Sequence, residues 1–271
     1  MPILLPLALM LMQVGPDPMG GRVPGIPEEL RDRPPPRKAT PETAKITALD
    51  TCLATAANDP AKARALAEAW VARTKGAQRA AGNHCLGVTS ANAGDWSAAS
   101  AAFLAARDEV GEARFRARMG ALAGSALLAR GEPAEALEVL DRAKSDAAGD
   151  AVLGAAVAAD RASALVALDR LAEAGAALTE ARALAPQDAH VWLLSATLSR
   201  RQGDLPSAQA QIEQAATLDP RDPAIGLEAG VIAALGGRDE AARQSFRSVI
   251  AAAPQSEAAR AAQGYLDQLG R

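Results

Sequence analysis

Aromatic residues are scarce in this 271-residue chain, where they make up only 3% of the sequence. Alanine is abundant instead, at about a quarter of the chain, and alanine is the best helix former among the amino acids. Small side chains let helices approach one another closely. The composition therefore favours a stack of thin helical layers over a single deep core.

The chain also lacks an excess of basic residues, since its formal net charge is −3 and its pI is about 5.6. Proteins that bind nucleic acid carry clustered positive charge to hold phosphates. We therefore expect no nucleic-acid partner.

No apolar run in the sequence is long enough to span a bilayer. Residues 3–12 form an apolar run of about ten residues, whereas a membrane-spanning helix needs about 20. This is the length of the apolar part of a secretory signal. We interpret residues 1–15 as a signal peptide and expect a periplasmic or secreted protein. The alternative is a cytoplasmic protein whose N-terminal run docks on a partner.

A proline-rich segment follows, with eight prolines between Pro16 and Pro41. Because proline removes a backbone donor and disrupts helices and central strands, we expect residues 16–42 to form a linker. Helical periodicity begins after it, so residues 43–271 are predicted to form the folded domain.

Residues that carry chemistry are few. The chain has two histidines and two cysteines, with no Cys-x-x-Cys motif and no glycine-rich phosphate loop in the required context. We therefore predict no catalytic residues, no metal site and no cofactor, and a protein that is not an enzyme.

The strongest pattern is a 34-residue period in the last 120 residues. The segments 155–188, 189–222 and 223–256 carry alanine, a bulky apolar residue, a small residue and proline at the same offsets. A fixed period of this length indicates one supersecondary unit stacked on copies of itself. The same offsets continue toward the N-terminus, with three or four extra residues in two repeats.

These offsets resemble those of the tetratricopeptide repeat family. We count six repeats, near residues 44–79, 80–116, 117–154, 155–188, 189–222 and 223–256, each numbered from its own first residue. Position 20 is alanine in all six, at Ala63, Ala99, Ala136, Ala174, Ala208 and Ala242. The resemblance implies an all-α, right-handed superhelix (a tetratricopeptide solenoid) of six helical pairs. We predict helices of about 12–14 residues, and a C-terminal capping helix over residues 257–270.

The two cysteines fall on the first helices of repeats 1 and 2, about one helical turn out of register. Because those helices should be stacked neighbours, Cys52 and Cys85 could meet. In an exported protein they would form a disulfide. In a cytoplasmic protein they would be two small buried thiols.

In the family, the first helix of each repeat lines a concave groove, which implies a non-enzymatic protein–protein interaction module. The candidate groove residues are His84, Arg118, Ser125, Ser163, His190, Leu193, Thr197, Arg200, Arg201 and Leu227. The expected groove is apolar and sparsely charged, so a helix or an extended peptide of another protein is the predicted partner. The alternative is that the chain's own helices or its proline-rich N-terminal segment fill it. We expect a scaffold or assembly factor of the bacterial cell envelope.

Overall fold

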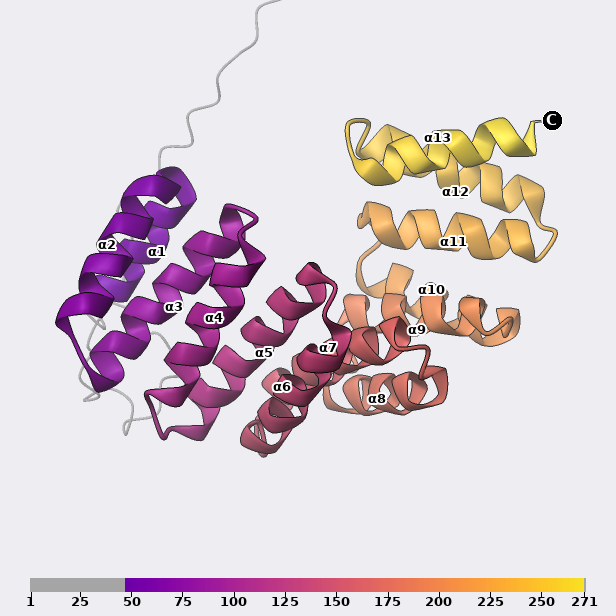
Figure 1. Ribbon diagram of the computed structural model, residues 1–271. Helices are drawn as coiled ribbons and strands as arrows, with labels where there is room; N and C mark the ends of the chain where they lie inside the picture. Colours follow the sequence, from indigo (N-terminus) through magenta and orange to yellow (C-terminus); the bar gives the residue numbers. More distant parts are fainter. Residues whose placement is uncertain (1–46, 271) are drawn as a thin grey trace, which may run out of the picture. The chain divides into compact units, whose positions relative to one another are not determined.

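The computed structural model describes residues 47–270. The segments interpreted as a signal peptide and a linker lie outside the described residues. Residues 47–270 contain thirteen α-helices and no strand, which confirms the predicted all-α class (Figure 1). The helices are α1 (Ala48–Asn58), α2 (Pro60–Arg73), α3 (Gly76–Asn92), α4 (Trp96–Asp108), α5 (Ala113–Arg130), α6 (Pro133–Asp146), α7 (Ala151–Ala167), α8 (Leu171–Leu184), α9 (Ala189–Arg201), α10 (Leu205–Leu218), α11 (Pro223–Leu235), α12 (Asp239–Ala252) and α13 (Glu257–Leu269).

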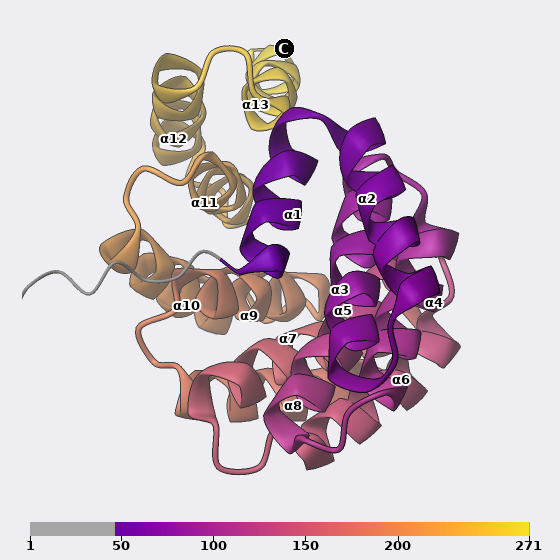
Figure 2. The same cartoon turned by 90° about the vertical axis from the view of Figure 1, so that its left-hand side faces the viewer.

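The helices form six consecutive hairpins, from α1–α2 to α11–α12, and α13 packs on the last one (Figures 1 and 2). Several first helices also contact the first helix of the next hairpin: α1 with α3, α5 with α7, α7 with α9, α9 with α11, and α11 with α13. These direct contacts place the first helices along the inner side of the array. We call the side lined by α3, α5, α7, α9 and α11 the inner face.

Short turns with helix-capping residues separate the helices. Aspartate side chains cap α2, α4, α7, α9, α10 and α11 by accepting a backbone N–H of the first turn. At the end of α5, Gly131 adopts a left-handed conformation with a φ of 80°, which a residue with a side chain rarely adopts. Pro133 then opens α6, where its missing N–H costs no helical hydrogen bond.

Close packing within a hairpin depends on position 8 of the first helix and position 24 of the second. At Gly230, an added Cβ would lie 2.3 Å from Cε1 of Phe246, and at Gly87 it would lie 2.5 Å from Cε1 of Phe103. A glycine at position 8 therefore makes room for a bulky side chain at position 24, which is an aromatic ring in these two repeats and Leu140 opposite Gly124 in a third. Where position 8 is alanine, position 24 is aliphatic, as in the pairs Ala162/Leu178 and Ala196/Ile212.

Three first helices are longer than predicted. α3, α5 and α7 have 17, 18 and 17 residues, and each begins four residues before the repeat start deduced from the sequence. The prediction of 12–14 residues is therefore wrong for these three. The residues that break the 34-residue period form an additional N-terminal turn of helix.

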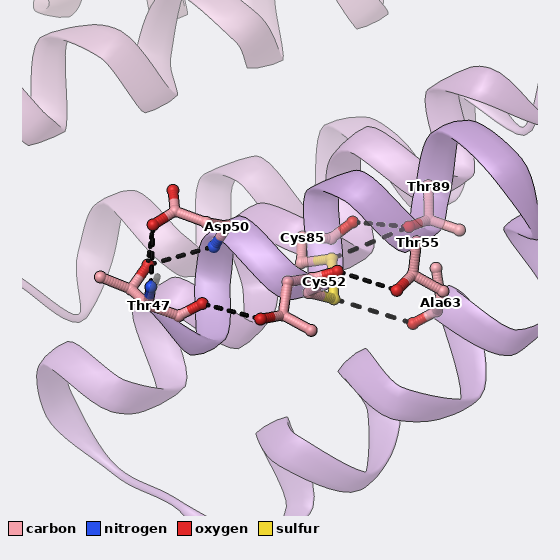
Figure 3. Close-up of a disulfide and its surroundings, with 8 residues drawn as sticks. Thr47, Asp50, Cys52, Thr55, Ala63, Cys85 and Thr89 are labelled. Atoms are coloured by element: carbon pink, nitrogen blue, oxygen red, sulfur yellow. Dashed lines mark hydrogen bonds between the residues drawn. A yellow bond between two sulfur atoms is a disulfide. The ribbon is translucent and has the colours of Figure 1, made fainter. Parts of the chain in front are cut away.

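A disulfide between Cys52 and Cys85 joins α1 to α3 (Figure 3). Both side chains are buried, in a small apolar cluster that also contains Leu53 and Trp70. Thr47 and Asp50 form a reciprocal capping box at the start of α1, in which each side chain accepts a backbone N–H of the other residue. The first hairpin is thus held both by packing and by a covalent bond.

The other end of the array carries a polar surface. Ser256 caps α13, and Ala259 and Ala262 are buried on its inner side. The residues that face away are exposed, namely Glu257, Arg260, Gln263, Asp267 and Gln268. Such a surface keeps the last repeat of an array soluble. Among the residues described, no helix combines the length and apolarity needed to cross a membrane.

Candidate peptide-binding groove

The ten candidate groove residues lie on five first helices. His84 is on α3, Arg118 and Ser125 are on α5, Ser163 is on α7, His190, Leu193, Thr197, Arg200 and Arg201 are on α9, and Leu227 is on α11. The structure does not give them equal roles. Some line hollows of the inner face, and others are occupied by contacts within the chain.

One hollow lies between α7 and α9 and has a volume of about 210 Å³. Three of the predicted residues, Ser163, Thr197 and Arg201, lie at its surface. Its apolar walls are Ala162, Val166, Leu178, Leu194 and Leu198. We call it the α7–α9 hollow. An apolar wall with a few polar groups at the edge is the usual character of a ligand-binding pocket.

A second hollow, of about 380 Å³, lies between the N-terminal turns of α5 and α7. Its apolar part consists of Phe115, Val152 and Leu153, and the side chain of Arg118 borders it. Val152 is 79% exposed. We call this the α5–α7 hollow. Sequence reasoning missed it because the additional helical turns build it, and these turns fall outside the 34-residue pattern.

Sequence reasoning also missed Asp160, a half-buried acid on α7 between the two hollows. The Ser125 hydroxyl donates a hydrogen bond of 2.8 Å to Oδ2 of Asp160. Burial raises the pKa of the Asp160 carboxyl above its ordinary range, and the Ser125 hydrogen bond and the charge of His190 partly oppose this shift. Asp160 makes no ion pair with any residue between 47 and 270.

Arg200 is engaged within the chain. Its Nε donates to Oε1 of Glu228 at 2.6 Å and its Nη2 donates to Oε2 at 3.3 Å, so α9 and α11 share a two-point ion pair. The two side chains are 24% and 12% exposed. The expectation that Arg200 would be available to a partner is therefore corrected, because its donors already serve Glu228.

Leu193 requires a similar correction. Its exposed fraction is only 9%, and it belongs to a core cluster with Ile212 and Ile225. Leu227 is partly buried against the cluster around Phe246. Both side chains therefore support the fold more than they line a groove.

The ring of His84 lies among aromatic side chains, with centroid distances of 6.4 Å to Phe103 and 6.4 Å to Phe115. Its Nδ1 is buried and has no hydrogen-bond partner within the described part of the chain. Burial lowers the pKa of His84, and the charge of Arg118 adds to this effect. His84 is thus a neutral ring near physiological pH, packed between side chains of α4 and α5.

The described residues contain no cluster of side chains that could bind a metal ion. Residues 47–270 contain no group of three or more His, Cys, Asp and Glu side chains placed to hold a metal ion. The inner face therefore presents two hollows and an acid between them, which is an arrangement suited to binding.

Comparison with known proteins identifies the repeat. Residues 193–257 match the family profile described as "Tetratricopeptide repeat". No curated protein sequence matches the chain. Residues 193–257 thus carry the tetratricopeptide repeat that the sequence predicted.

Solved structures show the same fold over most of the chain. PilW, described as a widely conserved type IV pilus biogenesis factor, is 18% identical, with a TM-score of 0.65 over 78% of this chain and 96% of its own. Pseudomonas aeruginosa pilF is 16% identical, with a TM-score of 0.63 over 80% of this chain and 95% of its own. TTC0263 of Thermus thermophilus, described as a thermophilic TPR protein, is 21% identical, with a TM-score of 0.59 over 69% of this chain and 99% of its own. The described residues therefore have the tetratricopeptide repeat fold.

Proposed function

We propose that this chain is a non-enzymatic protein–protein interaction module whose inner face binds a segment of another protein. The observation that carries the proposal is the α7–α9 hollow. It lies on the inner face of the array, its walls are apolar, and Ser163, Thr197 and Arg201 offer polar contacts at its edge. An apolar side chain of a partner fits this combination better than a polar metabolite does.

The energetics indicate that one hollow is not enough. Burying one large apolar side chain contributes about 1.5–3 kcal/mol, whereas micromolar affinity requires about 8 kcal/mol. A partner segment must therefore also use neighbouring surface. The α5–α7 hollow, with Phe115 and Val152, provides such surface along the same helix α7.

We further propose that the protein acts as a scaffold or assembly factor in the bacterial cell envelope, behind a signal peptide (residues 1–15) and a linker (residues 16–42). The Cys52–Cys85 disulfide supports this location, because disulfides persist in oxidising compartments. The likeness to PilW, a pilus biogenesis factor, adds support for a role in assembly. A cytoplasmic adaptor is the second candidate, and there both cysteines would be reduced. Alkylation of free thiols in protein from the native host, followed by mass mapping, distinguishes the two locations.

Site-specific photocrosslinking in the native host tests the binding function. A photoreactive residue replaces Val166 in the α7–α9 hollow, and in a matched variant it replaces Ala176, which is exposed on the second helix α8. We expect a discrete crosslinked protein from position 166 that is absent from position 176. Crosslinks of equal yield from both positions, or none from position 166, would contradict the proposal.

A further inference from the structure

Two acids occupy the same repeat position on the inner face but have different surroundings. Asp160 and Glu228 are both at position 6, in repeats 4 and 6. Glu228 receives a two-point ion pair from Arg200, which is at position 12 of the preceding repeat. In repeat 6, the acid at position 6 is therefore neutralised by an arginine of the preceding repeat.

Repeat 4 has no corresponding arginine at position 12 of the repeat before it. Position 12 of the preceding repeat is Leu128, a partly buried apolar residue that cannot donate a hydrogen bond. Among residues 47–270, Asp160 accepts one hydrogen bond, from Ser125 at 2.8 Å, and the only charge that acts on its pKa is that of His190. A half-buried carboxylate with one neutral donor opposes folding at neutral pH, because burial disfavours its charged form.

The position of Asp160 along α7 relates it to the α7–α9 hollow. Ser163 and Val166, which line this hollow, follow Asp160 by three and six residues. At a rise of 1.5 Å per residue, they lie about 4.5–9 Å further along the helix axis. In an extended peptide, residues i and i+2 are on one side and about 6.7 Å apart.

We propose that Asp160 binds the arginine or lysine side chain of a partner segment, and that the residue two positions later places an apolar side chain in the α7–α9 hollow. This inference rests on the proposed function and specifies its partner, an extended basic-x-apolar segment. The bound cation pairs with Asp160 in the way that Arg200 pairs with Glu228. The single carboxylate and the neighbouring hydroxyl offer acceptors for one cationic group.

Defined peptides test this inference on the full chain. The probe is a fluorescein-labelled ten-residue peptide with a central Leu-Gly-Arg-Ala-Leu in a Gly/Ser background, whose first leucine can reach the α5–α7 hollow. The matched peptide replaces arginine by citrulline, its neutral isostere. Fluorescence anisotropy gives both affinities. Because a hydrogen bond to a charged group strengthens binding by about tenfold or more, we expect the citrulline peptide to bind about tenfold more weakly.

Two variants then assign the preference to Asp160. Asp160→Asn should bind both peptides with affinities within about twofold of each other, since the charge is lost. Leu128→Arg should also bind the two peptides with similar affinities, because its arginine can pair with Asp160 as Arg200 pairs with Glu228. This variant keeps the test decisive if Asp160→Asn folds poorly. Asp239→Asn is the control: it makes the same charge change on α12, at an exposed site off the inner face, and should leave the arginine preference intact.

Several results would overturn the inference. They are equal binding of the two peptides to the unchanged protein, no binding of either, or an arginine preference that persists in Leu128→Arg. None of these bears on the Val166 crosslink. A crosslink at position 166 without an arginine preference would leave the binding function standing and refute only the role of Asp160.

Discussion

Gly230 and Gly264 both stand at position 8 of a first helix, but replacing each by alanine should have opposite effects. At Gly230, the new Cβ would lie 2.3, 2.6 and 2.8 Å from three carbons of the Phe246 ring. At Gly264, in α13, nothing lies within 4 Å, because no second helix follows α13 in the described chain. The same chemical change thus tests packing at one site and helix propensity alone at the other.

The expected magnitudes follow from two terms. Alanine is about 0.8–1.0 kcal/mol more favourable than glycine inside a helix, and both variants gain this. Overpacking a filled core site costs about 1–3 kcal/mol, and only Gly230→Ala incurs it. The Phe246 ring cannot yield easily, because it is fully buried and stacked on Tyr265 with a centroid distance of 5.3 Å. Gly264→Ala should therefore be stabilised, and the two variants should differ by about 1–3 kcal/mol.

Urea denaturation followed by circular dichroism measures the difference, and amide exchange in α11–α13 shows that it is local. Adding Phe246→Leu to Gly230→Ala provides a rescue, because repeat 4 already combines Ala162 with Leu178. The double variant should recover most of the overpacking cost. If Gly230→Ala were stabilised as much as Gly264→Ala, the packing argument for position 8 would be refuted.

Three further predictions concern the disulfide and the two acids of the inner face. Replacing Cys52 and Cys85 by serine should cost about 3–4 kcal/mol by the loop-entropy relation, since the cysteines are 33 residues apart, and accelerated amide exchange should be confined to α1–α3. Asp160→Asn should raise the melting temperature at pH 7. The folded-state pKa of Asp160 lies above its ordinary value of 3.8, so its charge opposes folding until the pH falls through the raised pKa, and the advantage of Asp160→Asn should shrink toward pH 4. Glu228→Gln should lower the free energy of unfolding by about 1.5–3 kcal/mol in urea denaturation, because it leaves Arg200 without its anionic partner. A loss of only about 0–1 kcal/mol, as for an exposed pair, would argue against this ion pair.

The sequence predicts the helical pairs well because their signals are local. An alanine at position 20 recurs in every repeat, and an aspartate caps the second helix in three of them, at α2, α4 and α10. The additional turns of α5 and α7 were not predicted, because a period locates extra residues without saying whether they extend a helix or a loop. Glu112 and Asp150 carry the missing signal, since each caps its helix four or more residues before the expected repeat start.

The groove is predicted less completely, for a physical reason. Family positions identify which residues point toward the inner face, and Ser163, Thr197 and Arg201 do line a hollow there. They do not show what each side chain already contacts. Arg200 was expected to be available but pairs with Glu228 on the next helix, and such contacts between repeats depend on both sequences at once.

Asp160 was not predicted as a groove residue for the same reason. It shows how the inner face could select a partner by one charge without a cluster of charges. Position 6 is apolar in the neighbouring repeats, at Leu122 and Leu194, and the sequence does not show which residues of the adjacent helices contact the acid in repeat 4. Replacing Leu128 by arginine would offer Asp160 the kind of partner that Arg200 provides for Glu228. The half-buried carboxylate of Asp160 lies between two hollows and accepts a hydrogen bond from the Ser125 hydroxyl, and these are the features on which the proposed cation binding depends. The same property would make binding and stability change in opposite directions in Asp160→Asn, a signature that a purely structural acid would not give.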